Sequence, residues 1–271
     1  MTHYVECGDT RIACDVAGDG PALLLMHGAE ATRHMFAGLL PHLTPHFRVI
    51  TYDQRDCGDT QGPDRPATLR ELADDARRLL AGLGLVRTHV FGSSFGGRIA
   101  QALAATWPQS VDRLVLGSTW PLPHSLAELY PDGMQQLAQL RAGLPATAQA
   151  LAGWFFPEAF LAERPELRDV FAQVRPSSDR SRRRAAAVED ALAIDWAAIR
   201  APTLLLWGAL DRVVPPALTQ SMAIHLPQAR FAALDGVGHA TAMQAPAAVA
   251  RLLYEFLCPE PQLFQQKETS S

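Results

Sequence analysis

The segment Gly92–Gly96 (GSSFG) places the strictest constraint on what this chain can fold into. An apolar run typical of a strand, Thr88–Phe91, precedes it, and a helical run begins at Gly97. This order predicts a turn so sharp that Ser94 is strained at its apex, with glycines on either side where a Cβ would clash. Such a turn exposes the Ser94 hydroxyl near a helix N-terminus, which favours developing negative charge. The pattern therefore favours a serine that attacks an acyl group.

Two other glycine-rich sites fit this segment less well. A phosphate-binding loop ends in Gly-Lys-Ser or Gly-Lys-Thr, and residues 92–96 have no such ending. A dinucleotide-binding turn has a different glycine spacing and belongs to the first strand–helix unit of a domain. A glycine-rich turn can also serve packing alone, but the strand before it and the helix after it favour the catalytic interpretation.

Size and charge narrow the class of protein. The chain has 271 residues, 48% of them apolar, which suits one large α/β domain or one domain with an insertion. Its formal charge of −4 favours neither nucleic acid nor an anionic membrane as a partner. The basic cluster Arg180–Arg184 is followed by Glu189 and Asp190, so we predict a solvated helix face there.

The cysteines and the chain start indicate the compartment. The four cysteines are dispersed and form no C-x-x-C pair, so neither a disulfide framework nor a zinc site is expected. No basic segment followed by an apolar one opens the chain, and no apolar run reaches about 18 residues. We therefore expect a cytoplasmic protein without metal or cofactor.

Buried strands alternate with helices along most of the chain. An antiparallel hairpin is predicted first, from Thr2–Glu6 and Arg11–Val16. The amphipathic stretch Thr68–Leu83 has leucines at helical spacing. Continuous apolar runs typical of parallel strands occupy Ala22–Met26, Arg48–Tyr52, Thr88–Phe91, Arg113–Gly117 and Pro202–Trp207. The alternation predicts a mainly parallel sheet that is covered on both faces.

One long interval breaks this alternation. From 120 to 198 the sequence is helical or loop-like, with no strand-like run. We predict a core formed by 1–119 and 199–258, a helical insertion at 120–198 and a frayed tail at 259–271. Large apolar side chains of the insertion pack it onto the core, and a few of them are candidates for a substrate pocket.

Of the nine histidines, His239 is the candidate base for Ser94. It lies in a glycine-rich loop between the strand-like Arg230–Leu234 and the helical Ala247–Leu257. Loops at the carboxyl ends of strands are where open parallel sheets place catalytic groups. The alternatives His42, His46 and His225 are expected at exposed helix positions, and the metal motif H-E-x-x-H is absent.

Asp211 is the candidate acid that orients His239. It directly follows a buried strand, and it gives the chain order Ser94, Asp211, His239 that a true serine turn of this kind requires. Asp235 is the competing carboxylate. Because it lies only four residues before His239, we assign it a role in stabilising the loop.

Backbone amides complete the predicted site. An oxyanion hole needs preorganised donors, and the N–H of Phe95 and the N–H of Ala29 are the candidates. Ala29 belongs to the loop after the strand that ends at Met26, where His27 is expected to brace the backbone. The Glu30 carboxylate in this loop must point away from a developing anion or bind a polar substrate group.

Five motifs in this order resemble the α/β-hydrolase fold family over nearly the whole chain. They are His27-Gly28, Asp53–Gly58, Gly92–Gly97, Gly208–Asp211 and Gly238-His239. The resemblance is to its bacterial esterases, enol-lactone hydrolases, cofactor-free haloperoxidases and meta-cleavage-product hydrolases. It implies an eight-stranded sheet with a helical cap over the active site. Asp56 departs from the family pattern, in which glycine is commoner there, and the backbone at this point is therefore an open question.

The leading hypothesis is hydrolysis of a small carboxylic ester or lactone by water. Ser94 would form an acyl-enzyme, His239 would carry the proton and Asp211 would hold the imidazole. A serine argues against dehalogenase or epoxide hydrolase chemistry, for which this family uses aspartate. A carbon–carbon bond hydrolase and a non-catalytic receptor are the alternatives, and the oligomeric state stays open. The candidates for binding substrate are Glu30, Trp120, Trp154 and Phe155.

Overall fold

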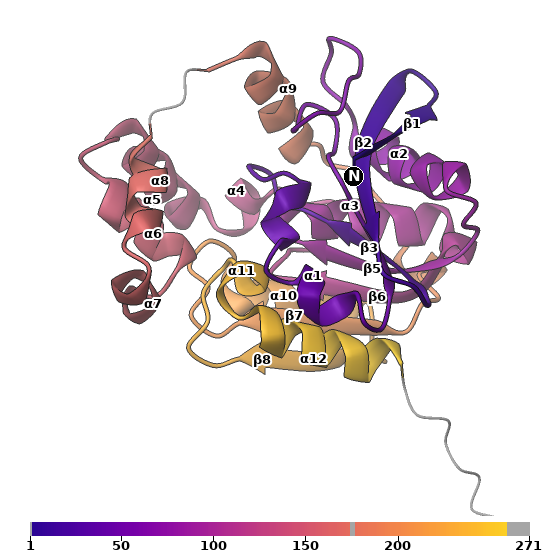
Figure 1. Ribbon diagram of the computed structural model, residues 1–271. Helices are drawn as coiled ribbons and strands as arrows, with labels where there is room; N and C mark the ends of the chain where they lie inside the picture. The colour runs from indigo at the N-terminus through magenta and orange to yellow at the C-terminus, as the bar shows by residue number, and fades with distance from the viewer. Residues whose placement is uncertain (1, 174–176, 259–271) are drawn as a thin grey trace, which may run out of the picture.

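The computed structural model describes residues 2–173 and 177–258. Its centre is an eight-stranded sheet in the order β1-β2-β4-β3-β5-β6-β7-β8 (Figure 1). The strands are β1 (His3–Cys7), β2 (Thr10–Ala17), β3 (Ala22–Met26), β4 (Arg48–Tyr52), β5 (Thr88–Ser93), β6 (Val111–Gly117), β7 (Thr203–Gly208) and β8 (Arg230–Leu234). The predicted tail, 259–271, lies outside the described residues.

Most strand pairs are parallel. From β4 across to β8 every neighbouring pair is parallel, whereas β2 is antiparallel to both β1 and β4. In the middle of the sheet, Leu24 of β3 pairs with Ile50 of β4 on one side and with Val90 of β5 on the other. The predicted eight-stranded, mainly parallel sheet is confirmed.

Alternate side chains of the central strands enter two apolar cores, one on each face of the sheet. In β3, Leu24 and Met26 belong to the core under α2 and α3, whereas Leu23 and Leu25 belong to the core under α1 and α12. These helices are α1 (Leu40–Leu43), α2 (Leu69–Gly82), α3 (Phe95–Thr106) and α12 (Pro246–Leu257). A strand that is buried on both faces needs apolar residues at every position, which explains the run Ala22–Met26.

Between β6 and β7 the described residues form helices and loops and no strand. The helices are α4 (Leu126–Leu129), α5 (Pro131–Ala142), α6 (Ala148–Phe155), α7 (Glu158–Glu163), α8 (Glu166–Ala172), α9 (Asp179–Val188) and the short 3-10 helix η3 (Trp196–Ala198). Figure 1 shows α5, α6, α7 and α8 gathered beside the sheet, with α9 standing apart from them. We call the stretch 120–198 the helical segment.

The remaining helices are short and lie in loops of the core. They are η1 (Arg33–Phe36), η2 (Pro108–Ser110), α10 (Pro216–Ser221), η4 (Met222–Ile224) and α11 (Thr241–Gln244). No helix among residues 2–173 and 177–258 combines the length and the apolar character that crossing a membrane requires.

Arg98 on α3 joins the two ends of the helical segment. Its side chain is fully buried. The guanidinium donates to the carbonyl oxygens of Pro123 (3.3 Å) and His124 (3.0 Å), where the segment leaves the core. It also donates to those of Val188 (2.5 Å) and Asp190 (2.9 Å), where the segment returns. The Arg98 guanidinium therefore binds both of the chain segments that connect the helical segment to the core.

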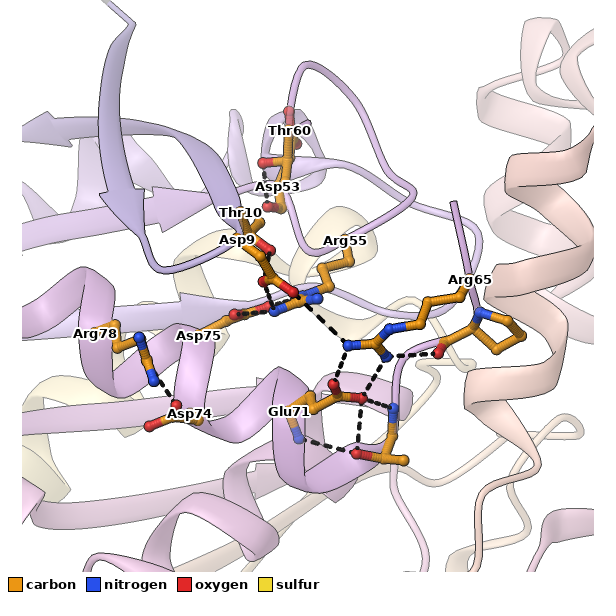
Figure 2. A network of polar contacts seen from close by, with 12 residues as sticks. Asp9, Thr10, Asp53, Arg55, Thr60, Arg65, Glu71, Asp74, Asp75 and Arg78 are labelled. Carbon is orange, nitrogen blue, oxygen red and sulfur yellow. Dashed lines mark hydrogen bonds and ion pairs between the residues drawn. The ribbon is translucent and has the colours of Figure 1, made fainter. Parts of the chain in front are cut away.

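A second arginine anchors the loop after β4. In Figure 2, Arg55 lies between Asp75 of α2 and Asp9 of the β1–β2 turn. Its Nε donates to Asp75 at 2.6 Å and its Nη2 donates to Asp9 at 2.8 Å. The side chains of Arg55 and Asp75 are both largely buried. Arg55 therefore attaches the loop to α2 through Asp75 and to the β1–β2 turn through Asp9.

The departure at Asp56 has a structural explanation. Its φ of 62° lies in the left-handed region, which glycine adopts more readily than a residue with a side chain. The side chain of Asp56 forms an ion pair with Arg183 of α9 at 2.7 Å. Arg183 also pairs with the exposed Asp64 at 3.3 Å, so Asp56 supplies the shorter of two ion pairs that connect this loop to the helical segment.

The prediction of a solvated face for Arg180–Arg184 holds for Arg180, Ser181 and Arg182, which are exposed, and is wrong for Arg184, which is buried. Arg180 donates to the carbonyl oxygens of Cys57 and Thr60, Arg183 pairs with Asp56, and Arg184 is buried. Arg182, which is exposed, pairs with Asp179 of its own helix. Around Arg184, the Ala29 carbonyl and the Gln54 side chain accept the hydrogen bonds that water would otherwise accept.

Candidate active site

Ser94 lies in a strained turn between β5 and α3. Its φ of 54° and ψ of −122° are rare for a residue with a side chain. Its amide donates to the carbonyl of Gly117 on β6 at 2.8 Å, and its carbonyl accepts from Gly97 at 2.8 Å. A Cβ on Gly92 would lie 2.5 Å from the carbonyl oxygen of Gly96, so this turn excludes any larger residue at position 92.

The structure brings together the three side chains that the sequence analysis selected. The Nε2 of His239 lies 3.1 Å from the Oγ of Ser94, and its Nδ1 lies 2.9 Å from Oδ2 and 3.1 Å from Oδ1 of Asp211. Asp211 and His239 are buried, whereas Ser94 is partly exposed. With Nδ1 donating to the carboxylate, Nε2 is the acceptor that faces the serine hydroxyl.

Backbone amides orient the Asp211 carboxylate. Its Oδ1 accepts from the N–H groups of Val213 and Val214, both at 2.9 Å. The strand before it ends at Gly208, where a Cβ would overlap the carbonyl oxygen of Gly238. The loops that carry Asp211 and His239 therefore approach each other so closely that only glycine fits between them.

The His239 loop is held from two sides. The amide of His239 donates to the carbonyl of Phe155, at the end of α6, at 2.9 Å. Gln244 accepts from the Gly238 amide and donates to the Gly236 carbonyl. The predicted loop-stabilising role of Asp235 is wrong, because this carboxylate is exposed and forms no hydrogen bond or ion pair with a described residue. Gln244, six residues after Gly238, stabilises the loop instead.

The candidate oxyanion donors lie beside Ser94. Phe95 is the first residue of α3, and its N–H has no acceptor among the described residues. Ala29 follows Gly28, where an added Cβ would lie 3.5 Å from the Ser94 Cβ and 3.9 Å from its Oγ. The Ala29 N–H likewise has no acceptor within residues 2–173 and 177–258. Both N–H groups are thus available to an oxygen bound next to Ser94.

His27 braces this loop as a neutral imidazole. Burial and the nearby Arg184 cation lower the pKa of His27 from 6.5 to about 3. Its Nδ1 lies 2.7 Å from the Gly28 carbonyl oxygen, and its Nε2 accepts from the backbone N–H of Gln54 at 3.2 Å. The neutral ring therefore donates through Nδ1, which places the proton on the Gly28 side.

The candidate substrate-binding residues lie in different surroundings. Phe155 contacts the site directly, because its ring meets the His239 imidazole edge-on at 5.7 Å. Trp120 and Trp154 are buried in an apolar cluster with Val214 between the helical segment and the core. Glu30 is exposed and points to the helical segment, where it pairs with Arg141 of α5 at 2.9 Å.

Sequence reasoning missed Arg184 and Gln54. The guanidinium of Arg184 donates to the Ala29 carbonyl at 3.0 Å and to the Gln54 side chain, and Gln54 donates to the His27 carbonyl at 2.8 Å. The only signal for Arg184 in the sequence is that alanine, an apolar residue, follows it three positions later on the same helical face. That signal is weak, because Arg182 and Arg183 are followed three positions later by an alanine as well.

Comparisons with known proteins identify the family and the fold. The family model described as alpha/beta hydrolase fold matches residues 21–246. A protein of Pseudomonas savastanoi pv. phaseolicola (strain 1448A / Race 6), named as a carbamate hydrolase, RutD, is 31% identical over 248 residues, which are 88% of this chain and 94% of that protein.

Solved structures show the same architecture. A thermophilic esterase from Thermogutta terrifontis superimposes with a TM-score of 0.78 and 28% identity, over 95% of this chain and 98% of the esterase. The enol-lactonase from Burkholderia xenovorans LB400 has a TM-score of 0.77 at 24% identity and covers 94% of this chain and 99% of its own, a likeness in fold alone.

Proposed function

The chain belongs to the alpha/beta hydrolase fold family, and we propose that it is a serine hydrolase that cleaves a small carboxylic ester or lactone. One observation carries the proposal: the His239 imidazole lies 3.1 Å from the Ser94 hydroxyl on one side and 2.9 Å from the Asp211 carboxylate on the other. A serine hydroxyl is a weak nucleophile at neutral pH, and this arrangement supplies the base that it needs.

In the first half of the proposed reaction, Ser94 Oγ attacks the carbonyl carbon while its proton passes to Nε2 of His239. The carbonyl oxygen becomes an anion, which the N–H groups of Ala29 and Phe95 stabilise. Asp211 keeps the imidazole in the required tautomer and stabilises its positive charge. When the tetrahedral intermediate collapses, the bond to the leaving oxygen breaks and His239 donates its proton to that oxygen. An alcohol departs, or the ring of a lactone opens.

In the second half, water hydrolyses the acyl-enzyme. Water attacks the acyl carbon and gives one proton to His239, and the same N–H groups stabilise the second tetrahedral anion. The bond to Ser94 Oγ then breaks, and the proton on His239 returns to the serine. A carboxylic acid leaves, and the enzyme regains its starting protonation without any other group.

We further propose that the helical segment, 120–198, acts as a cap on the core formed by 1–119 and 199–258. Contacts of the segment with the catalytic loops support this division. Phe155 accepts from the His239 amide, Arg184 donates to the Ala29 carbonyl, and Arg141 pairs with Glu30. A cover at this position would exclude bulk water from the oxyanion, where hydrogen bonds are stronger in a low dielectric.

A carbamate is the second candidate substrate. The relative named as a carbamate hydrolase is 31% identical over most of both chains. A carbamate places a nitrogen on the carbonyl carbon that Ser94 would attack, and the same residues would then form a carbamoyl-enzyme. The difference between the two candidates lies in the pocket rather than in the reacting groups.

The test is a panel of p-nitrophenyl acetate, simple lactones and p-nitrophenyl carbamates, with the wild-type protein and Ser94→Ala side by side. We expect turnover by the wild type, none by Ser94→Ala, and covalent labelling of the wild type alone by a fluorophosphonate. Labelling that persists in Ser94→Ala would overturn the proposal. Turnover of a dienolate dioxo acid alone would indicate carbon–carbon bond hydrolysis, and saturable binding without turnover would indicate a receptor.

A further inference from the structure

Arg184 of α9 is a buried cation that faces backbone oxygens. Its Nε donates to the Ala29 carbonyl at 3.0 Å, and its Nη2 lies 3.4 Å from the Gly28 carbonyl. The guanidinium carbon lies 4.5 Å above the ring of Phe95. No described carboxylate forms an ion pair with it, although burying an arginine is costly without compensation. Helix packing alone does not account for a charge at this position.

The contacts of His27 and Arg184 with this loop bear on where the Ala29 N–H points. Gly28 C=O and Ala29 N–H belong to one planar trans peptide, so they point in opposite directions. The Gly28 carbonyl is turned toward Arg184 and toward His27, whose Nδ1 lies 2.7 Å away. The Ala29 N–H must therefore point to the other side of the loop, and the Ala29 carbonyl fixes the next peptide through the Arg184 Nε.

Gln54, which supports this loop, is itself bound by Arg184. The guanidinium donates to the Gln54 side-chain oxygen, and the side-chain Nε2 of Gln54 donates to the His27 carbonyl at 2.8 Å. Arg184 thus reaches the peptides on both sides of Gly28, directly and through Gln54. On its other side it covers Phe95, whose N–H is the second candidate donor.

We propose that Arg184 is a positioning residue for the oxyanion hole, and that through it the helical segment controls catalysis on the core. The inference rests on the acyl-transfer reaction proposed above. Arg184 does not touch the reacting atoms; it holds the Gly28–Ala29 peptide plane so that the Ala29 N–H meets the oxyanion. An oxyanion donor acts in the transition state more than in the bound ester, so Arg184 affects kcat and leaves KM nearly unchanged.

The kinetic test compares Arg184→Met and Arg184→Lys with the control Arg183→Gln, which removes a neighbouring arginine of α9 that contacts Asp56 instead of the oxyanion loop. With p-nitrophenyl acetate we expect kcat to fall about 10- to 100-fold in Arg184→Met, with KM within about threefold of the wild type. Affinity for a trifluoromethyl ketone, which forms the tetrahedral adduct, should fall by the same factor as kcat. Arg184→Lys retains a cation without the planar fork and should be intermediate, and Arg183→Gln should match the wild type.

A chemical rescue separates positioning from loss of structure. In Arg184→Ala, guanidinium at millimolar concentration should restore part of kcat, whereas ammonium should not. The inference is overturned if kcat of folded Arg184→Met stays within about twofold of the wild type. It is also overturned if the adduct affinity does not follow kcat, or if Arg183→Gln loses as much activity as Arg184→Met.

A readout independent of activity distinguishes this inference from the proposed function. The amide resonance and hydrogen exchange of Ala29 should change in Arg184→Lys and stay constant in Arg183→Gln, whatever substrate the protein takes. An unchanged Ala29 amide would overturn the positioning role. If the Ala29 amide responds while Ser94 is neither labelled nor required for turnover, the serine hydrolase proposal fails and the structural link from Arg184 to the loop stands.

Discussion

The backbone amide of His239 donates a hydrogen bond of 2.9 Å to the carbonyl oxygen of Phe155. The candidate base thus depends on the last residue of α6 for its backbone position, although α6 belongs to the helical segment and His239 to the core. The Phe155 ring also meets the imidazole edge-on at 5.7 Å. Movement of the helical segment would therefore be transmitted to the base.

Replacing the Phe155 ring should affect activity through His239. Phe155→Ala keeps the backbone hydrogen bond but removes the wall against which the imidazole packs, so we expect kcat/KM for p-nitrophenyl acetate to fall about tenfold. Half-buried aromatic contacts are also lost, which should lower the free energy of unfolding by about 2 kcal/mol. Urea denaturation and initial rates measure the two effects.

Phe160→Ala is the matched control for this change. Phe160 is also half-buried and stacks on Phe156 at 5.3 Å, whereas the ring that meets the His239 imidazole is that of Phe155. We expect it to lose similar stability with little loss of kcat/KM. Equal losses of activity in Phe155→Ala and Phe160→Ala would show that the ring next to His239 has no special role.

Asp211→Asn should leave the fold intact and remove most of the activity. The amide oxygen can still accept from Val213 and Val214, so the loop keeps its hydrogen bonds. The amide nitrogen cannot accept from Nδ1 of His239, and the imidazole then adopts the tautomer that cannot take the Ser94 proton. We expect kcat to fall by about 10³- to 10⁴-fold, the size of the effect when an orienting carboxylate is lost from such a triad. A loss below about tenfold, with circular dichroism unchanged, would assign the acid to another residue.

Buried His27 should make the protein less stable in acid. Its folded-state pKa of about 3 lies below the ordinary value of 6.5, so the unfolded chain binds more protons between these values. The stability is fully present above about pH 6.5 and is lost as the pH falls toward 3. From pH 7 to pH 5 this histidine should cost about 2 kcal/mol of unfolding free energy.

Urea denaturation at both pH values, with wild type and His27→Gln, isolates this contribution. The glutamine variant should be less stable at pH 7 but should lose about 2 kcal/mol less than the wild type on acidification. The exposed His46 supplies the control, since His46→Gln should follow the wild-type pH dependence. Parallel curves for the wild type and His27→Gln would mean that His27 is not held neutral by burial.

Removing Arg98 should loosen both ends of the helical segment. Arg98→Met fills much of the same space but removes the side chain that donates to the carbonyls of Val188 and Asp190. Buried acceptors without partners are costly, and we expect a loss of about 3 kcal/mol in urea denaturation. Limited proteolysis should then cut within 120–198 before the core. Unchanged cleavage there would show that other contacts hold the segment.

Several features of the fold were predictable because their causes are local. A run such as Ala22–Met26 has apolar residues at every position because both of its faces are buried, and the strand has these bounds in the structure. Glycine at positions 92 and 208 records close backbone contacts that exclude a side chain. Thr68 and Glu71 form the capping box that begins α2. Each of these structural causes requires a particular type of residue at a particular position, which the sequence shows directly.

The errors have a common physical origin. A solvated face is predicted for Arg180–Arg184 because charged side chains are usually exposed to water. A sequence does not show that the carbonyls of Cys57 and Ala29 lie within reach of Arg180 and Arg184. A loop-stabilising role is predicted for Asp235 because it is near His239 in the chain, yet the hydrogen bonds that hold this loop come from Gln244 of α11.

The sequence by itself determined the family fold and selected Ser94, Asp211 and His239, because these roles require particular side chains at the ends of recognisable strands. The tertiary structure alone decided what supports them. Arg184 contacts the carbonyl of Ala29, 155 residues earlier, and His239 donates to the carbonyl of Phe155. Every residue has a carbonyl oxygen, so a partner of this kind leaves no trace in residue type, and only the folded chain shows which carbonyl is near.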